Sequence, residues 1–330
     1  MQSELIKRLT KKAKYRKYGG SGVGVDAFDD GAVIPPLGSD LELVVTADGH
    51  TASPLWFPGG DLGKLAAAGT INDLLVMGAT PVAVTSVVLV EEGFELERLY
   101  ALLDSFNEEL NFSEVALLAG DTKVLPRGAI SGVVLNTTGL GVKPKRWRTL
   151  DSNVRPGDHL ILTGSIGDHG VALMAFREGI SFETSLHSDV ASLTPLLKPV
   201  INRFGEYLHA MKDPTRGGLA AALNEWAEKS KVSLWLEEER VLVKPEVMAA
   251  CEMLGLDPYE VACEGRALLA VPPDVSDEVL SMLRNHELGR DAAIVGEAKA
   301  ERPGRVLLRT TVGGTRFVDP PVGALIPRIC

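Results

Sequence analysis

The chain has 330 residues, enough for two domains, and its 34 Lys and Arg against 44 Asp and Glu leave a net charge of −10. This acidic balance argues against nucleic acid as the main partner, because phosphate backbones are bound by clustered basic side chains. No apolar stretch is long enough to span a membrane, and three cysteines are too few for a disulfide scaffold. We therefore expect a protein of a reducing compartment such as the cytoplasm, with no membrane contact.

The N-terminal segment, residues 1–38, opens with a basic run. From Lys7 to Lys17, seven residues in eleven are Lys or Arg. A solvated helix face is the favoured interpretation of this run, and a binding tail is the alternative. No apolar core follows it, so we expect no signal peptide.

The first domain is predicted over residues 39–148. Apolar spacing predicts, in chain order, a strand at 40–50 that ends in a polar tip, a helix at 60–78, a strand at 82–90, a helix at 96–110, a strand followed by a polar turn at 115–124, and a strand at 129–142. We expect Asp61 near the start of the first helix and Gly78 at its end.

The second domain is predicted over residues 149–317, after a basic, proline-containing boundary at 143–158. Its predicted strands are HLIL, VSLWLEE, ALLAVPP, AAIVGEA and RVLLRT. Its predicted helices lie in GVALMAFREG, GGLAAALNEWAEKS, PEVMAACEMLGLD and VSDEVLSMLRNHE. Both halves mix strands and helices, which predicts an α+β fold in two domains.

The last stretch, residues 318–330, reads VDPPVGALIPRIC and has no periodicity. Its thirteen residues reach about 43–47 Å when extended. A flexible tail is the simplest interpretation. A purely solvating tail, however, needs neither the apolar residues nor the terminal thiol of Cys330.

Acidic and glycine-rich motifs stand at the predicted strand ends and on the first helix. They supply Asp30, Asp48, His50, Asn72, Asp73, Gly120, Asp121, Thr122, Lys123, Asp213, Thr215 and Gly217. Gathered carboxylates are costly unless they meet cations, and Mg²⁺ prefers carboxylate and phosphate oxygens. Lys64 and Lys123 would neutralise phosphate charge, and the glycines would let backbone N–H groups approach it. The combination predicts a site for Mg²⁺ and ATP, with the five aspartates as the candidate metal ligands.

Each motif alone has a simpler explanation. An Asp-Gly pair is usually a plain turn, Lys64 a surface lysine, and DPTRGG a helix cap. The sequence contains no GxxxxGK[ST] phosphate loop and no GxGxxG dinucleotide motif. Its histidines and cysteines lack the spacing of a structural zinc site.

Together the motifs resemble a known family. The segments PGGDLGKLAAAGTINDLLVMGATP, LAGDTKV, TGSIGDHGVALM, MKDPTRGGL, CEMLGLDPYEVACEGR and the terminal PRIC are similar to the HypE family of hydrogenase maturation proteins, within the aminoimidazole ribonucleotide synthetase superfamily. The resemblance covers residues 24–330. It implies an α+β fold whose N-terminal domain forms a barrel-like core across a homodimer and whose C-terminal domain is an α+β sandwich.

The resemblance also implies an activity. Members of this family receive a carbamoyl group on the C-terminal cysteine from a carbamoyltransferase partner. They dehydrate it with ATP to a thiocyanate and deliver cyanide to the iron of [NiFe]-hydrogenase on an iron-carrying scaffold complex. Carried over to this chain, Cys330 is the modified residue. Glu264 is the candidate base, and His50 is a second candidate.

This chain departs from the family pattern in three places. It has no His-Gly-x-Gly-Gly loop before Asp29, and it begins MQSELIKRL instead, which puts ATP affinity or turnover in question. Cys263 stands where the family has Asn, so that a disulfide with Cys330 is conceivable, and Arg266 stands in place of Lys. Two other functions stay open: a synthetase or kinase that acts on a free small molecule, and a scaffold without turnover.

Overall fold

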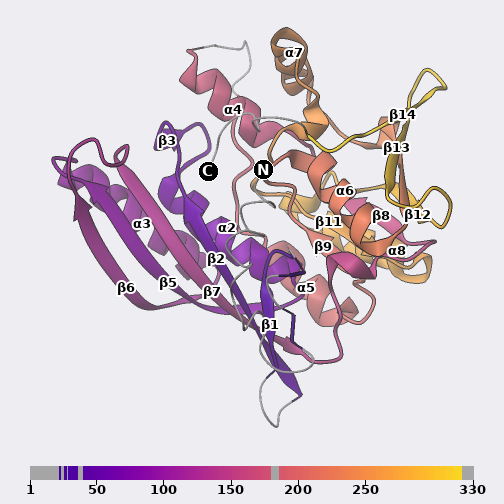
Figure 1. The fold of residues 1–330 in the computed structure, drawn as a ribbon, viewed down its shortest axis with the longest axis horizontal. Helices are drawn as coiled ribbons and strands as arrows, with labels where there is room; N and C mark the ends of the chain where they lie inside the picture. The colour runs from indigo at the N-terminus through magenta and orange to yellow at the C-terminus, as the bar shows by residue number, and fades with distance from the viewer. Residues whose placement is uncertain (1–21, 24–25, 28, 36–39, 180–185, 322–330) are drawn as a thin grey trace.

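The computed structural model describes residues 22–23, 26–27, 29–35, 40–179 and 186–321. Two sheets lie on opposite sides of the molecule, with helices packed between and around them (Figure 1). The basic run Lys7–Lys17 and the terminal Cys330 lie outside the described residues. Within the described ranges, no helix is both long enough and apolar enough to cross a membrane.

The first sheet is built from the N-terminal half in the strand order β1-β2-β7-β5-β6. The strands are β1 (Ala32–Ile34), β2 (Leu41–His50), β7 (Val133–Pro144), β5 (Thr80–Glu91) and β6 (Ala116–Leu125). All neighbours are antiparallel except β5 and β6, which are parallel and joined through a helix. Strand β1 lies within residues 1–38 and joins this sheet through β2.

The strand predicted at 40–50 is confirmed as β2, and its polar tip also pairs in register with β7, with Asp48 opposite Thr137. The polar turn expected at GDTK is wrong. This segment continues β6, because Asp121 pairs with Val87 of β5. A strand whose side chains alternate between two faces carries polar residues in its middle as easily as at its end.

Two helices, α2 (Leu62–Val76) and α3 (Leu96–Phe112), cover this sheet. The side chain of Asp61 caps α2 by accepting a hydrogen bond from the backbone N–H of Lys64 at 3.0 Å, and the helix ends before Gly78. Both predicted ends of this helix are confirmed. The hairpin β3 (Trp56–Phe57) and β4 (Gly60–Asp61) precedes α2.

The second sheet has the strand order β14-β13-β10-β12-β8-β11-β9. Its strands are β8 (His159–Leu162), β9 (Ala210–Lys212), β10 (Ser233–Glu237), β11 (Leu268–Val271), β12 (Ala293–Lys299), β13 (Arg305–Arg309) and β14 (Thr315–Phe317). The helices of this half are α4 (Asp168–Arg177), α5 (Thr194–Phe204), α6 (Gly218–Ser230), α7 (Pro245–Leu254) and α8 (Pro273–Arg284). The predicted α+β fold is confirmed in both halves.

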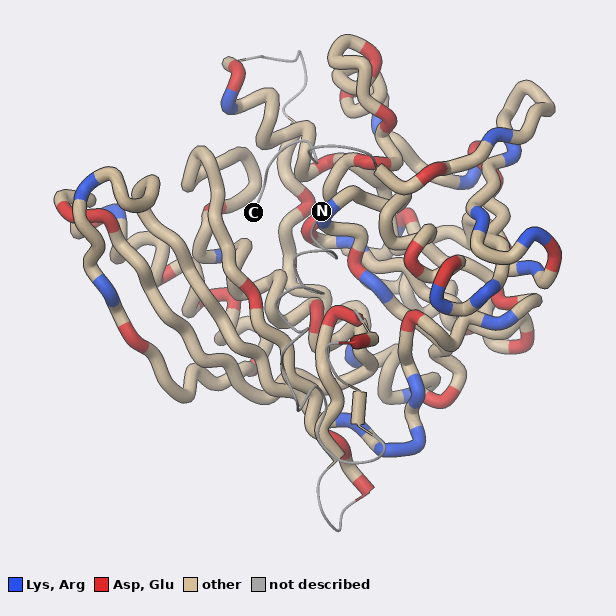
Figure 2. The backbone as a smooth tube through the Cα atoms, in the orientation of Figure 1, with Lys and Arg blue, Asp and Glu red and all other residues tan. Residues whose placement is uncertain are grey.

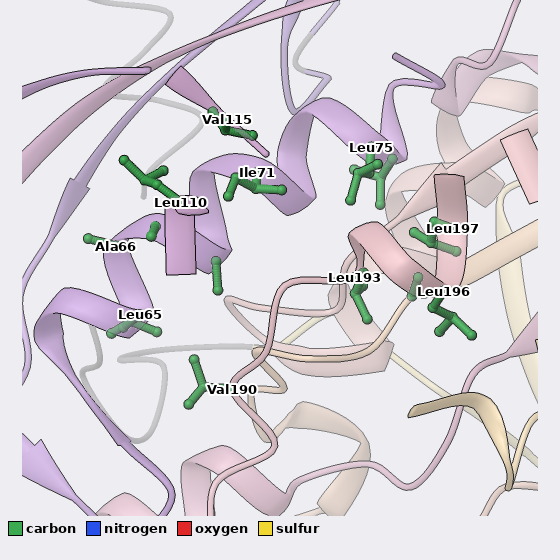
Figure 3. Close-up of a cluster of buried hydrophobic side chains, with 14 of the residues drawn as sticks. Leu65, Ala66, Ile71, Leu75, Leu110, Val115, Val190, Leu193, Leu196 and Leu197 are labelled. Carbon is green, nitrogen blue, oxygen red and sulfur yellow. The ribbon is translucent and has the colours of Figure 1, made fainter. Parts of the chain in front are cut away.

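One hydrophobic core crosses from the first half to the second. Buried residues of α2, among them Leu65 and Leu75, belong to the same cluster as Leu193 and Leu197 at α5 (Figure 3). The predicted boundary at residues 148–149 therefore falls within a continuous packed unit. Burial of this shared surface fixes the two sheets relative to each other, and the acidic motifs lie along the seam.

Candidate active site

Carboxylates from both halves meet at this seam, where Figure 2 places acidic segments between the two sheets. We call Asp30, Asp48, Asp73, Asp213 and Glu264 the acidic cluster. Asp73 lies on α2 and accepts a hydrogen bond from Thr46 of β2 at 2.7 Å. The same hydroxyl donates to the backbone oxygen of Asp30 at 3.0 Å, so Thr46 joins the DDG turn to the helix.

Electrostatics show that these carboxylates crowd one another. Burial raises the pKa of Asp73 well above its ordinary value, and the charges of Asp48, Asp213 and Asp30 raise it further. Burial and the nearby Asp30 raise the pKa of Asp213 from 3.8 to about 7. Mutual repulsion of this kind is relieved when a cation enters.

The segment DPTRGG places Asp213 in the cluster. It follows β9 and leads into α6, whose N-cap is Gly217. Gly217 has φ = +79°, and a side chain on Gly218 would come within 2.7 Å of the backbone oxygens of Tyr259 and Val261. Glycine is required for this close approach. The predicted turn that opens a helix is confirmed, with Thr215 in the turn and its N–H bonded to the oxygen of Asp213 at 3.0 Å.

Glu264 reaches the cluster from the loop before β11. It is buried, and its pKa is raised well above the ordinary value, first by burial and then by Asp213, Asp189 and Asp48. The positive charge of Arg216 acts in the opposite direction. A carboxylate whose pKa is raised holds a proton more strongly than an ordinary carboxylate, which fits the expected role of Glu264 as a base.

His50 lies in the same region but is held in a protein network. Its Nε2 is 3.3 Å from the hydroxyl of Thr70, 3.2 Å from that of Thr137 and 3.9 Å from the carboxylate of Asp48. Burial lowers the pKa of His50, the charge of Asp48 opposes this effect, and Arg216 adds to it. The net shift favours the neutral ring.

Within the acidic cluster, Asp30 is also held by a buried group of charged side chains outside the cluster. Lys212 bonds both oxygens of Asp30, at 2.9 and 3.0 Å, and lies 3.2 Å from Asp151. Lys229 bonds Asp151 at 2.6 Å and Asp29 at 3.1 Å, and the indole of Trp226 bonds Asp151 at 2.8 Å. We call Asp29, Asp151, Lys212, Trp226 and Lys229 the lysine network.

Sequence reasoning missed this network and also Arg216. Lys212 and Arg216 flank Asp213 and Thr215 in the motif. Their position next to candidate site residues was the sequence feature that could have indicated a role for them. Asp151 lies in the predicted boundary, far along the chain from its partners. Only the folded arrangement brings it under Lys212 and Lys229.

The motif GDTK does not join the acidic cluster within one chain. Asp48 pairs with Thr137, Thr137 with Ser86 and Ser86 with Gly120, so three strand spacings, about 14 Å, separate Asp48 from Gly120. Asp121, Thr122 and Lys123 are exposed on β6, at the edge of the sheet. Within a single copy of the chain, these residues therefore lie at the sheet edge and not at the seam.

Two further predicted residues lie on α2. Asn72 joins the domains through its amide: its nitrogen donates to the oxygens of Ala191 at 3.0 Å and Glu264 at 3.4 Å, and its oxygen accepts from the N–H of Leu193 at 2.8 Å. Asn72 therefore lies beside Glu264 and links the two domains by hydrogen bonds. Lys64 is half-buried in the first turn of α2.

The acidic cluster fits a divalent cation that nucleotide phosphates help to bind. Among the described side chains, no group of three or more His, Cys, Asp or Glu is arranged to hold a metal alone. Mg²⁺ normally takes one or two carboxylates and fills the remaining positions with water and phosphate oxygens. Crowded carboxylates with raised pKa values, beside the cationic Arg216, suit that mode of binding.

Fold and site together define a two-domain protein of the AIR synthase class. Residues 28–143 match the model for the AIR synthase related protein N-terminal domain, and residues 155–309 match the model for its C-terminal domain. The acidic cluster draws its residues from both of these domains.

Within that class the chain belongs to the HypE family of hydrogenase maturation proteins. It is 44% identical to the carbamoyl dehydratase HypE of Rhizobium leguminosarum, over 87% of this chain and 82% of that protein. It is 43% identical to a hydrogenase expression/formation protein of Methanocaldococcus jannaschii, over all of this chain and 96% of the relative.

Solved structures agree. The fold is similar to that in a crystal structure of a HypE–HypF complex, with a TM-score of 0.88 and 36% identity over 96% of this chain and 99% of that one. A HypE structure in complex with ATP matches with a TM-score of 0.84 and 36% identity over 87% of each chain. The family and the fold expected from the sequence are both confirmed.

Proposed function

We propose that this chain is an ATP-dependent carbamoyl dehydratase of [NiFe]-hydrogenase maturation and that its substrate is its own carbamoylated Cys330. The observation that carries the proposal is the acidic cluster, which gathers carboxylates of both domains beside Glu264. The kinship with carbamoyl dehydratases and the terminal PRIC support it. The absence of a membrane-spanning helix in the described residues and the free, buried Cys251 and Cys263 are compatible with the expected cytoplasmic location.

We propose Mg²⁺ with ATP in the acidic cluster. Asp30, Asp48, Asp73 and Asp213 would hold the metal, which when bound screens the phosphate charge. Arg216 lies near enough to lower the pKa of both His50 and Glu264, so its guanidinium is placed to contact phosphate. Thr215 and Gly217 offer the turn before α6, where backbone N–H groups favour anions.

The proposed reaction removes water from a carboxamide. The γ-phosphoryl group of ATP passes to the carboxamide oxygen and makes it a leaving group as phosphate. Phosphorylation of the oxygen releases one nitrogen proton to water, and Glu264 accepts the other as the C–O bond breaks and the C≡N bond forms. The products are the thiocyanate on Cys330, ADP and phosphate, and the thiocyanate supplies the cyanide ligand of the iron.

We also propose a homodimer with a barrel-like core, formed along β6. This edge strand exposes its residues on both faces, including the large apolar side chains Leu117, Leu118 and Val124. An uncovered apolar edge invites pairing with another strand. Pairing of two copies would bring Asp121 and Lys123 to the interface, where they could serve the site of the partner copy.

The further partners we propose are a carbamoyltransferase, which loads Cys330, and the iron-carrying scaffold complex that accepts the cyanide. A solved complex of a similar HypE protein with HypF supports a maturation partner. The net charge of −10 argues against nucleic acid as a further partner.

Intact-mass spectrometry tests the proposal. The purified chain, incubated with the carbamoyltransferase and its carbamoyl donor, should gain the mass of one carbamoyl group, and addition of Mg²⁺ and ATP should then remove one water. Cys330→Ala should show neither change, whereas Cys251→Ala, a buried cysteine on α7, should show both. Loading and dehydration in the Cys330→Ala chain would refute the proposal.

A further inference from the structure

A polar cavity separate from the acidic cluster lies in the C-terminal half, next to the loop that carries Glu264. Its volume is about 360 Å³, and its charged lining comes from Asp168, Asp189, Lys244, Glu246 and Arg266. We call it the carboxylate pocket. None of these residues has a place in the reaction proposed above.

Two buried carboxylates of this pocket keep an unused acceptor oxygen. Asp168 is fully buried, and its Oδ2 is bonded by Ser165 at 2.6 Å and lies 2.7 Å from Lys244 Nζ, but its Oδ1 has no hydrogen-bond partner. The Oδ1 of Asp189 accepts the N–H of Glu264 at 3.1 Å, and its Oδ2 has no hydrogen bond. Buried acceptors without partners are rare in proteins and point to a missing donor.

Arg266 does not satisfy either oxygen. Arg266 forms ion pairs with Asp168 Oδ2 at 3.6 Å and with Asp189 Oδ2 at 3.5 Å but no hydrogen bond to either carboxylate. Its hydrogen bonds go to the backbone oxygen and hydroxyl of Ser165 and to the backbone oxygen of Leu288. Asp168 Oδ1 and Asp189 Oδ2 therefore each lack a hydrogen-bond donor. A guanidinium group supplies several N–H donors in a planar fork, which suits two such carboxylate acceptors.

The C-terminal segment of the chain contains such a group. Arg328 is the one cationic residue from Val318 to Cys330. Val318 packs in the same buried cluster as Cys263 and Tyr259, so the described chain ends on the half that contains the pocket. The seven residues that follow Pro321, up to and including Arg328, reach about 23–25 Å when extended.

We propose that the carboxylate pocket binds Arg328 of the chain's own tail and thereby positions Cys330 beside Glu264. Arg328 precedes Cys330 by two residues, and Glu264 donates its backbone N–H to Asp189, a carboxylate of the pocket. Glycine at 265 permits this contact, since a Cβ there would lie 1.8 Å from the backbone oxygen of Asp189. The inference rests on the proposed function, and Arg328 is a positioning residue in it.

Alkylation of Cys330 tests docking without any need for activity. Full-length protein is treated with iodoacetamide, and the rate at Cys330 is followed by mass spectrometry of the C-terminal peptide. Docking should protect the thiol, so Arg328→Gln should raise the rate about fivefold, and Arg328→Lys should restore part of the protection. Asp189→Asn should raise the rate by the same factor, and the double variant should add nothing further.

Dehydration of the carbamoylated protein supplies the second readout. Arg328→Gln should slow the loss of water about tenfold while the KM for ATP stays unchanged, since the tail residue is remote from the nucleotide. Unchanged alkylation in Arg328→Gln, or effects of Arg328→Gln and Asp189→Asn that multiply, would overturn the inference. Arg328 lies in the tail, so its variants test the pocket even if Asp189→Asn fails to fold. A wild-type chain that never loses water refutes the proposed function instead, and the alkylation rates still decide the docking.

Discussion

Two groups of buried charge meet at Asp30, and they are built in opposite ways. In the lysine network, the carboxylates of Asp29 and Asp151 are matched by Lys212 and Lys229 within 3.2 Å. In the acidic cluster, Asp48, Asp73 and Asp213 repel one another, and the pKa values of Asp73 and Asp213 rise. The charges of the first group are balanced within the protein, and we propose that a bound cation balances those of the second.

This contrast separates a structural group from a binding group without reference to conservation. Lys212 keeps a raised pKa because Asp30 and Asp151 outweigh the cost of its burial, so it stays charged and holds the DDG turn against the C-terminal half. The DDG turn then presents Asp30 to Asp213. The balanced network therefore positions one edge of the unbalanced cluster.

Asp151→Ala should produce the largest loss of stability. It removes the carboxylate bonded by Lys212, Lys229 and Trp226, so each of the two buried lysines loses one of its anionic partners. Loss of one member of such a group costs about 3–5 kcal/mol, measured as the free energy of unfolding in urea. Glu225→Gln is the matched control: Glu225 also lies 3.2 Å from Lys212 but is 46% exposed, so its loss should cost less than about 1 kcal/mol. Equal losses for the two variants would show that the network is not a balanced unit.

Asp213→Asn should have the opposite effect to Asp151→Ala: it should reduce activity without reducing stability. It removes a charge that the bound cation needs, so ATP-dependent dehydration should fall about 100-fold or more, measured in single turnover. It also removes a repelled carboxylate, so stability without ligand should not fall at neutral pH. A variant that retains turnover, or one that loses stability at neutral pH, would contradict the assignment of Asp213 to the ligand site.

The pH dependence of stability sharpens the same comparison. The folded-state pKa of Asp213 is raised from 3.8 to about 7, so the fold favours its protonated form. The protonated Asp213 therefore stabilises the fold fully at a pH below its pKa in the unfolded chain. This contribution is lost as the pH rises through its pKa in the folded protein. Asp213→Asn should therefore gain about 2–4 kcal/mol over the wild type between about pH 4 and pH 7, seen as a growing difference in Tm. A constant difference across this range would mean that the carboxylate does not titrate as described.

Glu264→Gln should have the most selective effect. The amide keeps the size of the side chain and the backbone contacts to Asn72 and Asp189, but it cannot accept the proton. We expect the rate of water loss to fall about 10²-fold while the KM for ATP stays near the wild-type value. A matching loss in ATP affinity would assign Glu264 to nucleotide binding.

Much of the fold follows from local pattern. The helix at 62–76 was predicted from apolar spacing, with Asp61 and Gly78 at its ends, because caps and periodicity are local properties. The helix α5 was not predicted, since it follows a loop and contains Pro199. The short strands β1 and β9 were missed because they gain stability only from pairing with distant strands.

The site was predictable in part for the same reason. Asp48, Asp73, Asp213 and Glu264 were found by residue type and motif, and the fold brings them together. The strand position of GDTK was not predicted, because a polar run reads as a turn until its pairing with β5 is known. The lysine network depends on contacts between residues 60 to 200 positions apart, which no local pattern contains.

The central claim is that the acidic cluster binds ATP through Mg²⁺. Calorimetric titration of ATP into the purified protein, with and without Mg²⁺, tests it most directly. We predict Mg²⁺-dependent binding that is lost in Asp213→Asn and retained in Glu225→Gln. Binding of equal strength without Mg²⁺, or unchanged binding in Asp213→Asn, would contradict the claim.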